Sequence, residues 1–267
     1  MAPLAEQTGA GTRRAADRLP AIRLDGVSKA FGRGKDRVLA LDRLTLDIFP
    51  GEFVCLVGAS GCGKSTLLNL VCGLDAPSVG TVELPAGGRP TLLFQEAALF
   101  PWLTATENVE LPLRLRGTPK RERKERAADL LDRVQLSDAA RKRPHELSGG
   151  MRQRVALARA LADEAEVLCM DEPFGALDAM TRDLLHDELE RIWRDSGLTV
   201  LFVTHNVREA VRLGDRVVLL SSRPGRVVDE EKVGIDRPRR IESPEVSQQA
   251  IRIRDLLSAE VRRHGTD

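Results

Sequence analysis

The chain has 267 residues, 42% of them hydrophobic, so it is long enough for one large domain with a substantial apolar core. Its 41 Lys and Arg residues nearly equal its 40 Asp and Glu residues, which argues against a nucleic-acid partner bound through bulk positive charge. No apolar run approaches the roughly 20 residues that a membrane-spanning helix needs, and residues 1–20 lack the apolar stretch of a secretion signal. Any membrane role is therefore expected to be peripheral.

The N-terminal part of the chain predicts a tail followed by short strands. Residues 1–20 are rich in Ala, Arg, Gly and Thr without a hydrophobic period, which is typical of a flexible tail. Short runs at 22–24 and 44–48 predict an antiparallel β element. Phe31 lies between these runs, just before a glycine-containing loop, and its position is compatible both with stacking on an adenine ring and with packing in the core.

A glycine-rich loop at residues 58–65 predicts a nucleotide phosphate site. The apolar run before it suits a buried strand, and residues 65–72 have the apolar spacing of a helix. The loop fits the pattern Gly, four residues, Gly-Lys-Ser, in which glycines let several backbone N–H groups approach phosphate oxygens at once. We expect Lys64 on the β and γ phosphates, Ser65 on Mg²⁺ and Thr66 on the α phosphate. The predicted contacts of this loop are Gly58, Ala59, Ser60, Gly61, Cys62, Gly63, Lys64, Ser65 and Thr66.

The four cysteines lack the spacing of metal ligands, which favours reduced thiols in a cytosol. Cys62 lies within the phosphate loop itself. We therefore formulate the hypothesis that alkylation of Cys62 blocks nucleotide binding and that ATP protects the thiol.

The chain becomes helical and highly charged after Gln95. Ala127, Leu130, Leu131 and Val134 have helical spacing, and Pro119 is favourable at the start of such a helix. The charge run at 120–126 is typical of a solvated helix face. This block interrupts an alternation of strands and helices, so we expect it to be an inserted helical subdomain.

Two carboxylates follow the apolar run 167–170, which predicts a buried parallel strand with acids at its carboxyl end. Asp171 is placed to hold Mg²⁺, and Glu172 is placed as the general base for attack on the γ-phosphate. Beyond them, a helix at 181–194, a strand at 199–203, a helix at 207–213 and a strand at 216–220 predict a mostly parallel sheet. Residues beyond about 230 are charged and only weakly periodic.

The order of these motifs resembles the ATP-binding cassette (ABC) ATPases from Ile22 to about Val228. The run Leu147-Ser148-Gly149-Gly150, followed by Gln153, matches the signature of that family. The resemblance also identifies Gln95 as the Q-loop glutamine, Asp178 as the D-loop aspartate and His205 as the switch histidine. It implies an α/β fold, a P-loop NTPase (RecA-like) core of mostly parallel sheet with an antiparallel β element and an inserted α-helical subdomain.

We expect the domains to divide as a flexible tail at 1–20, a RecA-like core at 21–95 and 163–229, a helical subdomain at 96–162 and a C-terminal extension at 230–267. In the family, the signature of one cassette meets the γ-phosphate held by the phosphate loop of a second cassette. The resemblance therefore implies a homodimer that sandwiches two ATP molecules, with Ser148, Gly149, Gly150 and Asp178 as further ATP contacts. It implies a catalytic set of Gln95, Glu172 and His205, and Mg²⁺ ligands Ser65, Gln95 and Asp171.

Residues 94–104 and 107–109 look like the cassettes of bacterial importers for nitrate, sulfonates and taurine. In such importers, the segment after the Q-loop lines a groove for a helix of the membrane permease. The apolar residues Leu99 to Trp102 suit that contact, and packing in the core of the subdomain is the alternative.

The resemblance implies a peripheral ATPase subunit on the cytoplasmic side of the membrane, served indirectly by a periplasmic or lipoprotein solute-binding protein, with no nucleic acid as a partner. A soluble ABC ATPase acting on nucleic acid or ribosomes is the alternative. Such proteins generally resemble two joined cassettes or carry long coiled-coil insertions, and this chain has neither feature.

Overall fold

The structure is a computed structural model that describes residues 19–85, 88–175 and 177–264. Residues 1–18 of the expected tail, Ala176 of the D-loop motif and residues 265–267 of the C-terminal extension lie outside the described residues. Within the described ranges, no helix is both long and apolar enough to cross a bilayer.

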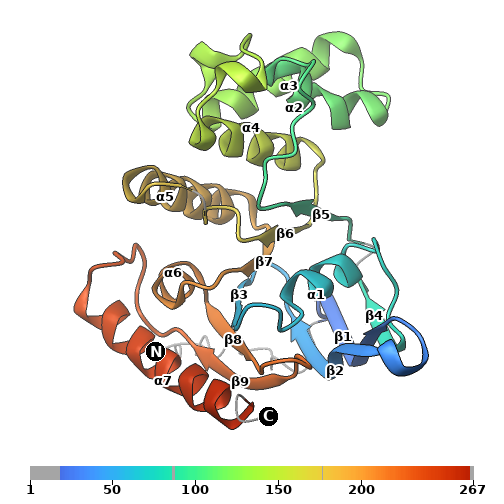
Figure 1. Cartoon of the computed structure of the whole chain (residues 1–267). Coiled ribbons are helices and arrows are strands. Elements are labelled where there is room, and N and C mark those ends of the chain that lie inside the picture. The colour runs from blue at the N-terminus through green and yellow to red at the C-terminus, as the bar shows by residue number, and fades with distance from the viewer. Residues whose placement is uncertain (1–18, 86–87, 176, 265–267) are drawn as a thin grey trace, which may run out of the picture.

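A six-stranded sheet in the order β5-β6-β7-β3-β8-β9 forms the centre of the molecule (Figure 1). Five of these strands are parallel, and β9 pairs with β8 in the antiparallel direction. The strands are β3 (Phe53–Gly58), β5 (Pro90–Leu93), β6 (Val167–Asp171), β7 (Thr199–Val203), β8 (Arg216–Leu220) and β9 (Val227–Lys232). Every residue of β3 and β7 is buried, which is why these segments are continuous apolar runs in the sequence.

A second, three-stranded antiparallel sheet has the order β2-β1-β4. Its strands are β1 (Ile22–Phe31), β2 (Val38–Ile48) and β4 (Val79–Glu83). The expected antiparallel element is therefore confirmed, although β1 and β2 are longer than the short alternating runs that predicted them. Irregular register between β1 and β2 after Leu24 breaks the strict alternation, which hides the full length of the strands from a period-two pattern.

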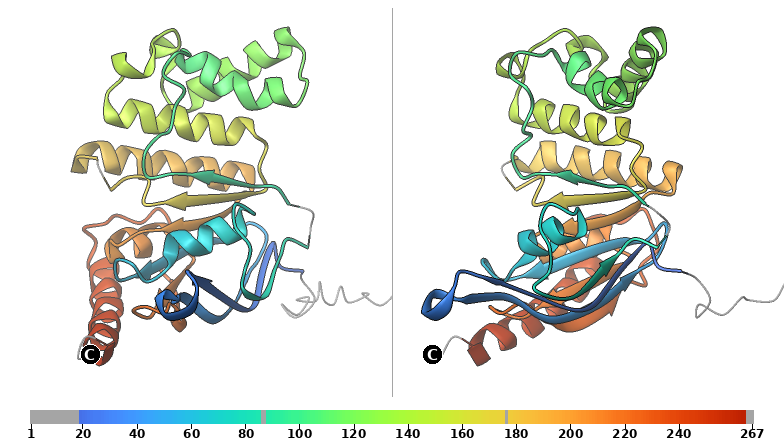
Figure 2. Two further views of the ribbon diagram at one scale, coloured as in Figure 1. Left: turned by 45° about the vertical axis from the view of Figure 1, so that its right-hand side comes forward. Right: turned by 90° about the vertical axis from the view of Figure 1, so that its right-hand side faces the viewer.

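Seven α-helices surround these sheets within the described residues. They are α1 (Lys64–Val71), α2 (Ala105–Leu115), α3 (Lys120–Arg133), α4 (Gly149–Ala162), α5 (Ala179–Ser196), α6 (Val207–Leu213) and α7 (Pro244–His264). Single-turn 3₁₀ helices lie at Gly34–Asp36, Ser137–Ala139 and Pro144–Glu146. Helices α2, α3 and α4 contact one another and lie together at one end of the molecule (Figure 2).

The two faces of the central sheet pack into two different hydrophobic clusters. Val54 and Leu56 of β3 join the cluster that holds α1 against the antiparallel sheet, whereas Phe53 and Cys55 join the cluster that contains residues of α4, α5 and α6. This alternation places helices on both sides of the strands and confirms the predicted α/β architecture with a mostly parallel sheet.

Helix α7 is the largest element that the sequence pattern did not reveal. It packs on α6 through Val246, Ala250 and Ile253, which are all buried and recur at helical spacing. Numerous charged residues separate these apolar positions, so the segment looked weakly periodic.

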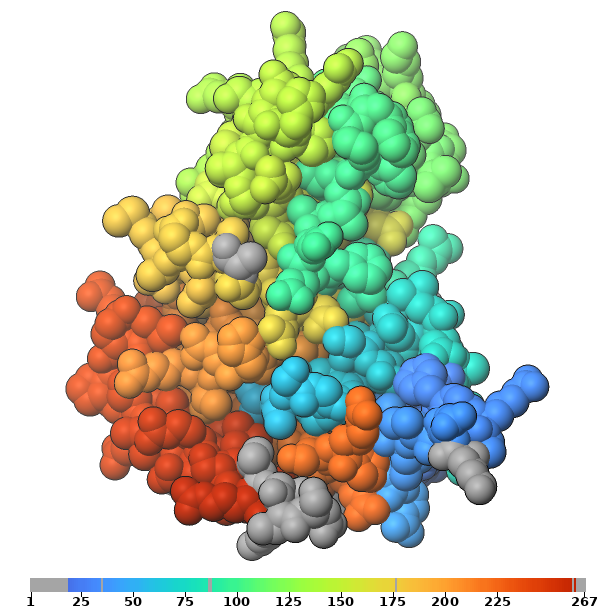
Figure 3. All heavy atoms as spheres, viewed as in Figure 1, coloured from blue at the N-terminus to red at the C-terminus, as the bar shows by residue number. Residues whose placement is uncertain are grey.

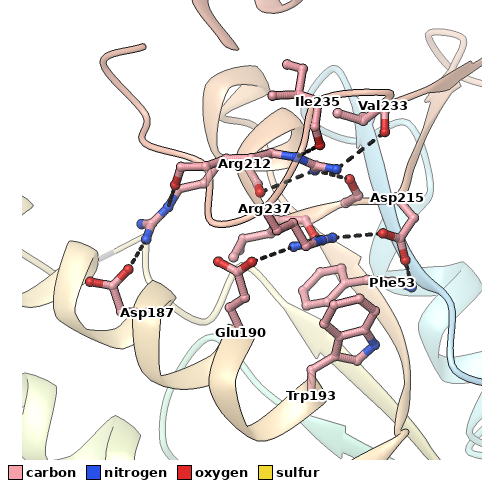
Figure 4. A network of polar contacts seen from close by, with 12 residues as sticks. Phe53, Asp187, Glu190, Trp193, Arg212, Asp215, Val233, Ile235 and Arg237 are labelled. Carbon is pink, nitrogen blue, oxygen red and sulfur yellow. Dashed lines mark hydrogen bonds and ion pairs between the residues drawn. The ribbon is translucent and has the colours of Figure 1, made fainter. Parts of the chain in front are cut away.

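An arginine cluster, formed by Arg237 and Arg239, connects the segment between β9 and α7 to α5 and α6. Figure 4 shows the contacts of Arg237 with Glu190 and Asp215. The buried guanidinium of Arg239 donates to the backbone oxygens of Val211 at 2.9 Å and Ile235 at 2.8 Å, and also to those of Gly214 and Val233. Burial is the main reason that the pKa of Arg239 falls to about 10. Nearby, Arg237 bonds Glu190 at 3.1 Å and Asp215 at 2.9 Å, and it stacks 4.5 Å from the centre of the Trp193 ring.

We expect Arg239→Ala to lower the free energy of unfolding by about 3 kcal/mol, because the carbonyl groups at the end of α6 lose a charged donor. Urea unfolding of both proteins measures the difference. The control is Arg240→Ala, which removes the neighbouring exposed guanidinium and should change stability by less than about 0.5 kcal/mol. Equal losses in the two variants would contradict this account of the cluster.

Candidate nucleotide site

The ends of three parallel strands place the candidate site at one edge of the central sheet. Val203 at the end of β7 is paired with Leu56 of β3 on one side and with Asp171 of β6 on the other. The chain turns into the phosphate loop two residues after Leu56, and Glu172 follows Asp171. Residues that are far apart in the sequence therefore meet at the carboxyl edge, where parallel sheets bind ligands.

Backbone conformation at the phosphate loop requires glycine. Gly63 has φ +100°, and a Cβ there would lie 2.8 Å from the carbonyl oxygen of Ala40. Lys64 follows as the first residue of α1 and is 6% exposed. Its ammonium group donates to the carbonyl oxygens of Gly58 at 2.9 Å and Ala59 at 3.0 Å, so the loop holds the positive charge in place.

An open cleft of about 410 Å³ lies over this loop and the strand edge. Its lining includes groups from the loop, the acidic pair and the antiparallel sheet, namely Phe31, Val38, Ala40, Ser60, Gly61, Gly63, Lys64, Ser65, Thr66, Gln95, Asp171, Glu172 and Arg223. Phe31 is 45% exposed at this cleft, so packing in the core is excluded for its ring. Arg223 was missed by sequence reasoning, and the Ser-Arg-Pro-Gly turn after β8 was its one visible signal.

The acidic pair takes two different environments. Burial raises the pKa of Asp171, and the neighbouring Glu172 adds to this effect, whereas a hydrogen bond with the Ser65 hydroxyl opposes it. A hydroxyl and a carboxylate that meet in this way form an oxygen donor set that suits Mg²⁺.

Glu172 has φ +44°, a left-handed conformation that is uncommon for residues other than glycine. Its N–H donates to the oxygen of Val203 at 3.0 Å, which holds the turn in this conformation. Its Oε2 lies 2.8 Å from Nδ1 of His205, and the His205 side chain is 65% exposed. The structure thus joins the expected base, which lines the cleft, to the expected switch histidine, which is not part of that lining.

Gln95 connects the cleft to the helical group α2–α4. It lies in the segment after β5, and its backbone oxygen accepts a hydrogen bond of 2.5 Å from Nε2 of Gln153. Gln153 belongs to α4 and is buried. Gln95 and α4 are therefore joined by a direct contact.

The signature residues lie at the beginning of α4 and do not line the cleft. Ser148 is the N-cap of α4, and its hydroxyl accepts from the N–H of Met151 at 3.2 Å. Packing within this chain favours a glycine at position 150, because a Cβ on Gly150 would lie 2.4 Å from Cγ2 of Thr181. Gly149 is exposed, and the nearest atoms to a Cβ at that position are 3.9 Å away, so packing within this chain does not require a glycine there.

Asp178 also lies outside the cleft lining, as an exposed N-cap of α5. It accepts a hydrogen bond of 3.0 Å from the N–H of Thr181, and this bond holds the pKa of Asp178 below its ordinary value. Thr181 thus bonds the Asp178 side chain and also packs against Gly150, so the beginning of α5 contacts the beginning of α4.

Cys62 turns its side chain away from the cleft. The residue is fully buried, its thiol lies close to Gly58, and burial raises the pKa of that thiol. Its N–H donates to the oxygen of Ala59 at 3.3 Å. The structure removes the basis for rapid alkylation of Cys62, because a buried, protonated thiol is a poor nucleophile.

The aromatic segment after Gln95 is only partly packed. Leu99 contacts the main hydrophobic cluster, but Phe100 and Trp102 are 37% and 67% exposed. Their rings lie 5.5 Å apart, and Arg159 of α4 supports the segment by donating to the oxygens of Ala98 at 2.8 Å and Ala97 at 3.1 Å. Figure 3 shows the chain after β5 running over the surface toward the helical group.

Comparison with known proteins matches residues 41–175 to the ABC transporter family. The nitrate import ATP-binding protein of Synechocystis sp. is 44% identical over 80% of this chain and 83% of its own length. The taurine import ATP-binding protein of Mesorhizobium japonicum is 50% identical over 74% of this chain and 79% of its own length. The aliphatic sulfonates import ATP-binding protein of Burkholderia ambifaria is 48% identical over 82% of this chain and 66% of its own length.

A solved dimer of an ATP-binding cassette, in a post-hydrolysis state with ADP and Pi, has the same fold with a TM-score of 0.71. It is 35% identical in sequence, and the match covers 80% of this chain and all of that one. Sequence, fold and the geometry of the strand edge agree. The chain belongs to the ABC transporter family and is one of its ATPase cassettes.

Proposed function

We propose that this chain is the ATP-hydrolysing subunit of a bacterial ABC importer for nitrate, aliphatic sulfonates or taurine. It works as a homodimer on the cytoplasmic side of the membrane, bound to integral permease subunits. A periplasmic or lipoprotein solute-binding protein delivers the solute to those subunits. The printed functions of the relatives support this solute class, and none of those reported above favours a role on nucleic acid or ribosomes.

The division of the phosphate-binding groups carries the proposal. Lys64, Ser65 and the acidic pair line the cleft, whereas Ser148 and Gly149 are exposed at the beginning of α4 and lie outside it. A helix N-terminus with an exposed glycine and hydroxyl is suited to bind an anion, because its N–H groups and dipole favour negative charge. The γ-phosphate in the cleft of a second copy is the anion that fits, so two copies arranged head to tail complete two sites.

The residues of the cleft and the neighbouring His205 divide the work of hydrolysis. Lys64 stabilises charge on the phosphate oxygens, Glu172 accepts the proton of the attacking water, and His205 orients Glu172 through the observed contact. Ser65, Asp171 and Gln95 would hold Mg²⁺, which supplies charge neutralisation on the phosphates when bound. Phe31 stacks on the adenine ring at the rim of the cleft.

The exposed aromatic pair supports a permease contact. Phe100 and Trp102 lie on the segment that begins at Gln95, so the same stretch of chain reaches both the nucleotide and the surface. Closure of the dimer around ATP would then move the segment that contacts the permease. Aromatic side chains that remain exposed on a folded subunit are favourable anchors for such a partner.

We expect Glu172→Gln to bind ATP with nearly unchanged affinity but to lower the turnover rate about 100-fold or more, because the amide cannot accept the proton. Steady-state phosphate release and equilibrium ATP binding measure the two properties. The control Glu83→Gln removes an exposed carboxylate on β4 and should leave both properties unchanged. Hydrolysis by Glu172→Gln at the parental rate would show that another group is the base.

Ser148→Arg should abolish hydrolysis while the isolated chain still binds ATP, because the added bulk and charge block the N-terminus of α4 but leave the cleft intact. Ligand binding below the dimerisation concentration and phosphate release above it separate the two effects. Ser137→Arg places the same side chain at an exposed site near the end of α3 and serves as the control. Equal loss of binding and hydrolysis in Ser148→Arg would argue for a site made by one chain.

Trp102→Ala should reduce co-purification with the permease about tenfold or more, since a buried aromatic anchor is lost from the interface. The ATPase activity of the isolated cassette should stay at the parental level. Leu115→Ala removes another highly exposed apolar side chain, at the end of α2, and should retain the permease. Full retention of the permease by Trp102→Ala would remove this segment from the proposed interface.

A further inference from the structure

A buried polar network lies directly beneath the turn that carries His205. His186 of α5 is fully buried, and its Nε2 lies 2.6 Å from Oε1 of Glu209 on α6. The hydroxyl of Thr204 donates to the other carboxylate oxygen of Glu209 and accepts a hydrogen bond of 2.9 Å from the N–H of Asn206. Thr204 and Asn206 flank His205 in the chain, so the network holds the turn from both sides.

The network is connected to Glu172 and His205, the proposed catalytic pair. Val203, the residue before Thr204, accepts the N–H of Glu172 at 3.0 Å. Thr204 and Glu209 line a small cavity together with Glu172 and His205, and its volume of about 30 Å³ is large enough for one water molecule. The buried carboxylate of Glu209 and the expected base thus border the same space.

Helix α6 is held at both ends, which makes it a rigid support for this turn. At its beginning, the Asn206 side chain accepts from the N–H groups of Arg208 at 3.1 Å and Glu209 at 3.3 Å. At its end, Arg239 donates to the backbone oxygens of Val211 and Gly214. Helix α7 packs against α6 (Figure 1). The position of α6 therefore sets the position of Thr204 and, with it, that of His205.

A gain in folding stability does not by itself explain why these polar groups are buried. A buried acid paired with a histidine is often no more stabilising than apolar residues of the same volume. Among the described residues, Nδ1 of His186 finds no hydrogen-bond partner, and the nearest carboxylate oxygen, on Asp183, is 3.8 Å away. The network is directional, however, and a directional network can fix a turn that apolar packing would leave adjustable.

We propose that Thr204 and Glu209 are positioning residues that hold His205 against Glu172 during hydrolysis. This inference rests on the proposed function, in which Glu172 is the base and His205 orients it. His186 holds the carboxylate of Glu209 in place through their hydrogen bond. The Thr204 hydroxyl in turn bonds both this carboxylate and the N–H of Asn206, so the position of the carboxylate determines that of the backbone on both sides of His205. Neither Thr204 nor Glu209 contacts the nucleotide in this account.

The test uses the full chain as purified dimer and compares kcat with KM for ATP. Thr204→Val keeps the shape of the side chain but removes the hydroxyl, so kcat should fall about tenfold or more while KM changes less than about twofold. Thr204→Ser retains the hydroxyl and should recover most of the parental kcat. Glu209→Gln, which keeps the size of the side chain, is the second variant and should show the same pattern as Thr204→Val.

The matched control is Thr199→Val at the opposite end of β7. Thr199 is also buried, and its hydroxyl accepts one backbone hydrogen bond, from Gly51 at 3.1 Å. Loss of that bond should lower the unfolding midpoint without lowering kcat. A similar fall of kcat in Thr199→Val and Thr204→Val would assign both effects to stability and overturn the proposal.

A double-mutant cycle with His205→Ala identifies the route of the effect. If Thr204 acts through His205, then Thr204→Val should cause no further loss in single-turnover hydrolysis when His205 is already absent. An equal fold loss in both backgrounds, or a parental kcat for Thr204→Val, would overturn the proposal. These outcomes differ from a failure of the proposed function, in which Glu172→Gln would itself retain activity.

Discussion

The row of paired residues Leu56, Val203 and Asp171 is the constraint on which the rest of the site depends. Parallel pairing aligns the ends of β3, β7 and β6. The phosphate loop, the turn that carries His205 and the acidic pair therefore begin at the same edge of one sheet. The side chains of β3 pack into two hydrophobic clusters, which resists any shift of this strand. A slip of one residue in this pairing would turn every side chain of the strand to the opposite face and separate the acids from the loop.

Short contacts connect this edge of the sheet to the rest of the molecule. The backbone of Gln95 is bonded to Gln153 of α4, and Ser148 caps the same helix. The nucleotide cleft, the exposed signature and the aromatic segment are thus connected through one helix and one stretch of chain. On the other side, Glu172 contacts His205, and the network beneath His205 leads to α6 and α7. In the proposed importer, the first connection drives the permease and the second keeps the catalytic pair aligned.

The sequence predicted best those segments whose conformation is determined by residues within or next to the segment. The strand at Thr199–Val203 and the helix at Val207–Leu213 have the bounds that we expected, because a buried strand is a continuous apolar run and the helix has an asparagine cap. Fold class followed from the order of such segments. The phosphate loop could be recognised because its glycines answer a local steric need, as the left-handed conformation of Gly63 illustrates.

The features that could not be predicted depend on partners distant in the sequence. Helix α7 buries one narrow stripe against α6, which a charged sequence conceals. The side chain of Cys62 points into the core beside Gly58, where the absence of a Cβ leaves room for the sulfur, and nothing in the loop motif states that direction. His186 and Glu209 looked like ordinary polar residues of two helices, since only the tertiary fold brings their side chains together.

The central claim is that each active site combines the phosphate loop of one copy with the signature of another. A mixture of Lys64→Ala and Ser148→Arg chains tests it most directly, because each variant alone forms only defective sites. In a mixed dimer, the intact loop of one chain faces the intact signature of the other, so mixing should restore ATP hydrolysis to at most about a quarter of the parental rate when pairing is random. If the mixture stays as inactive as its components while mixed dimers are demonstrably present, the site does not span two copies.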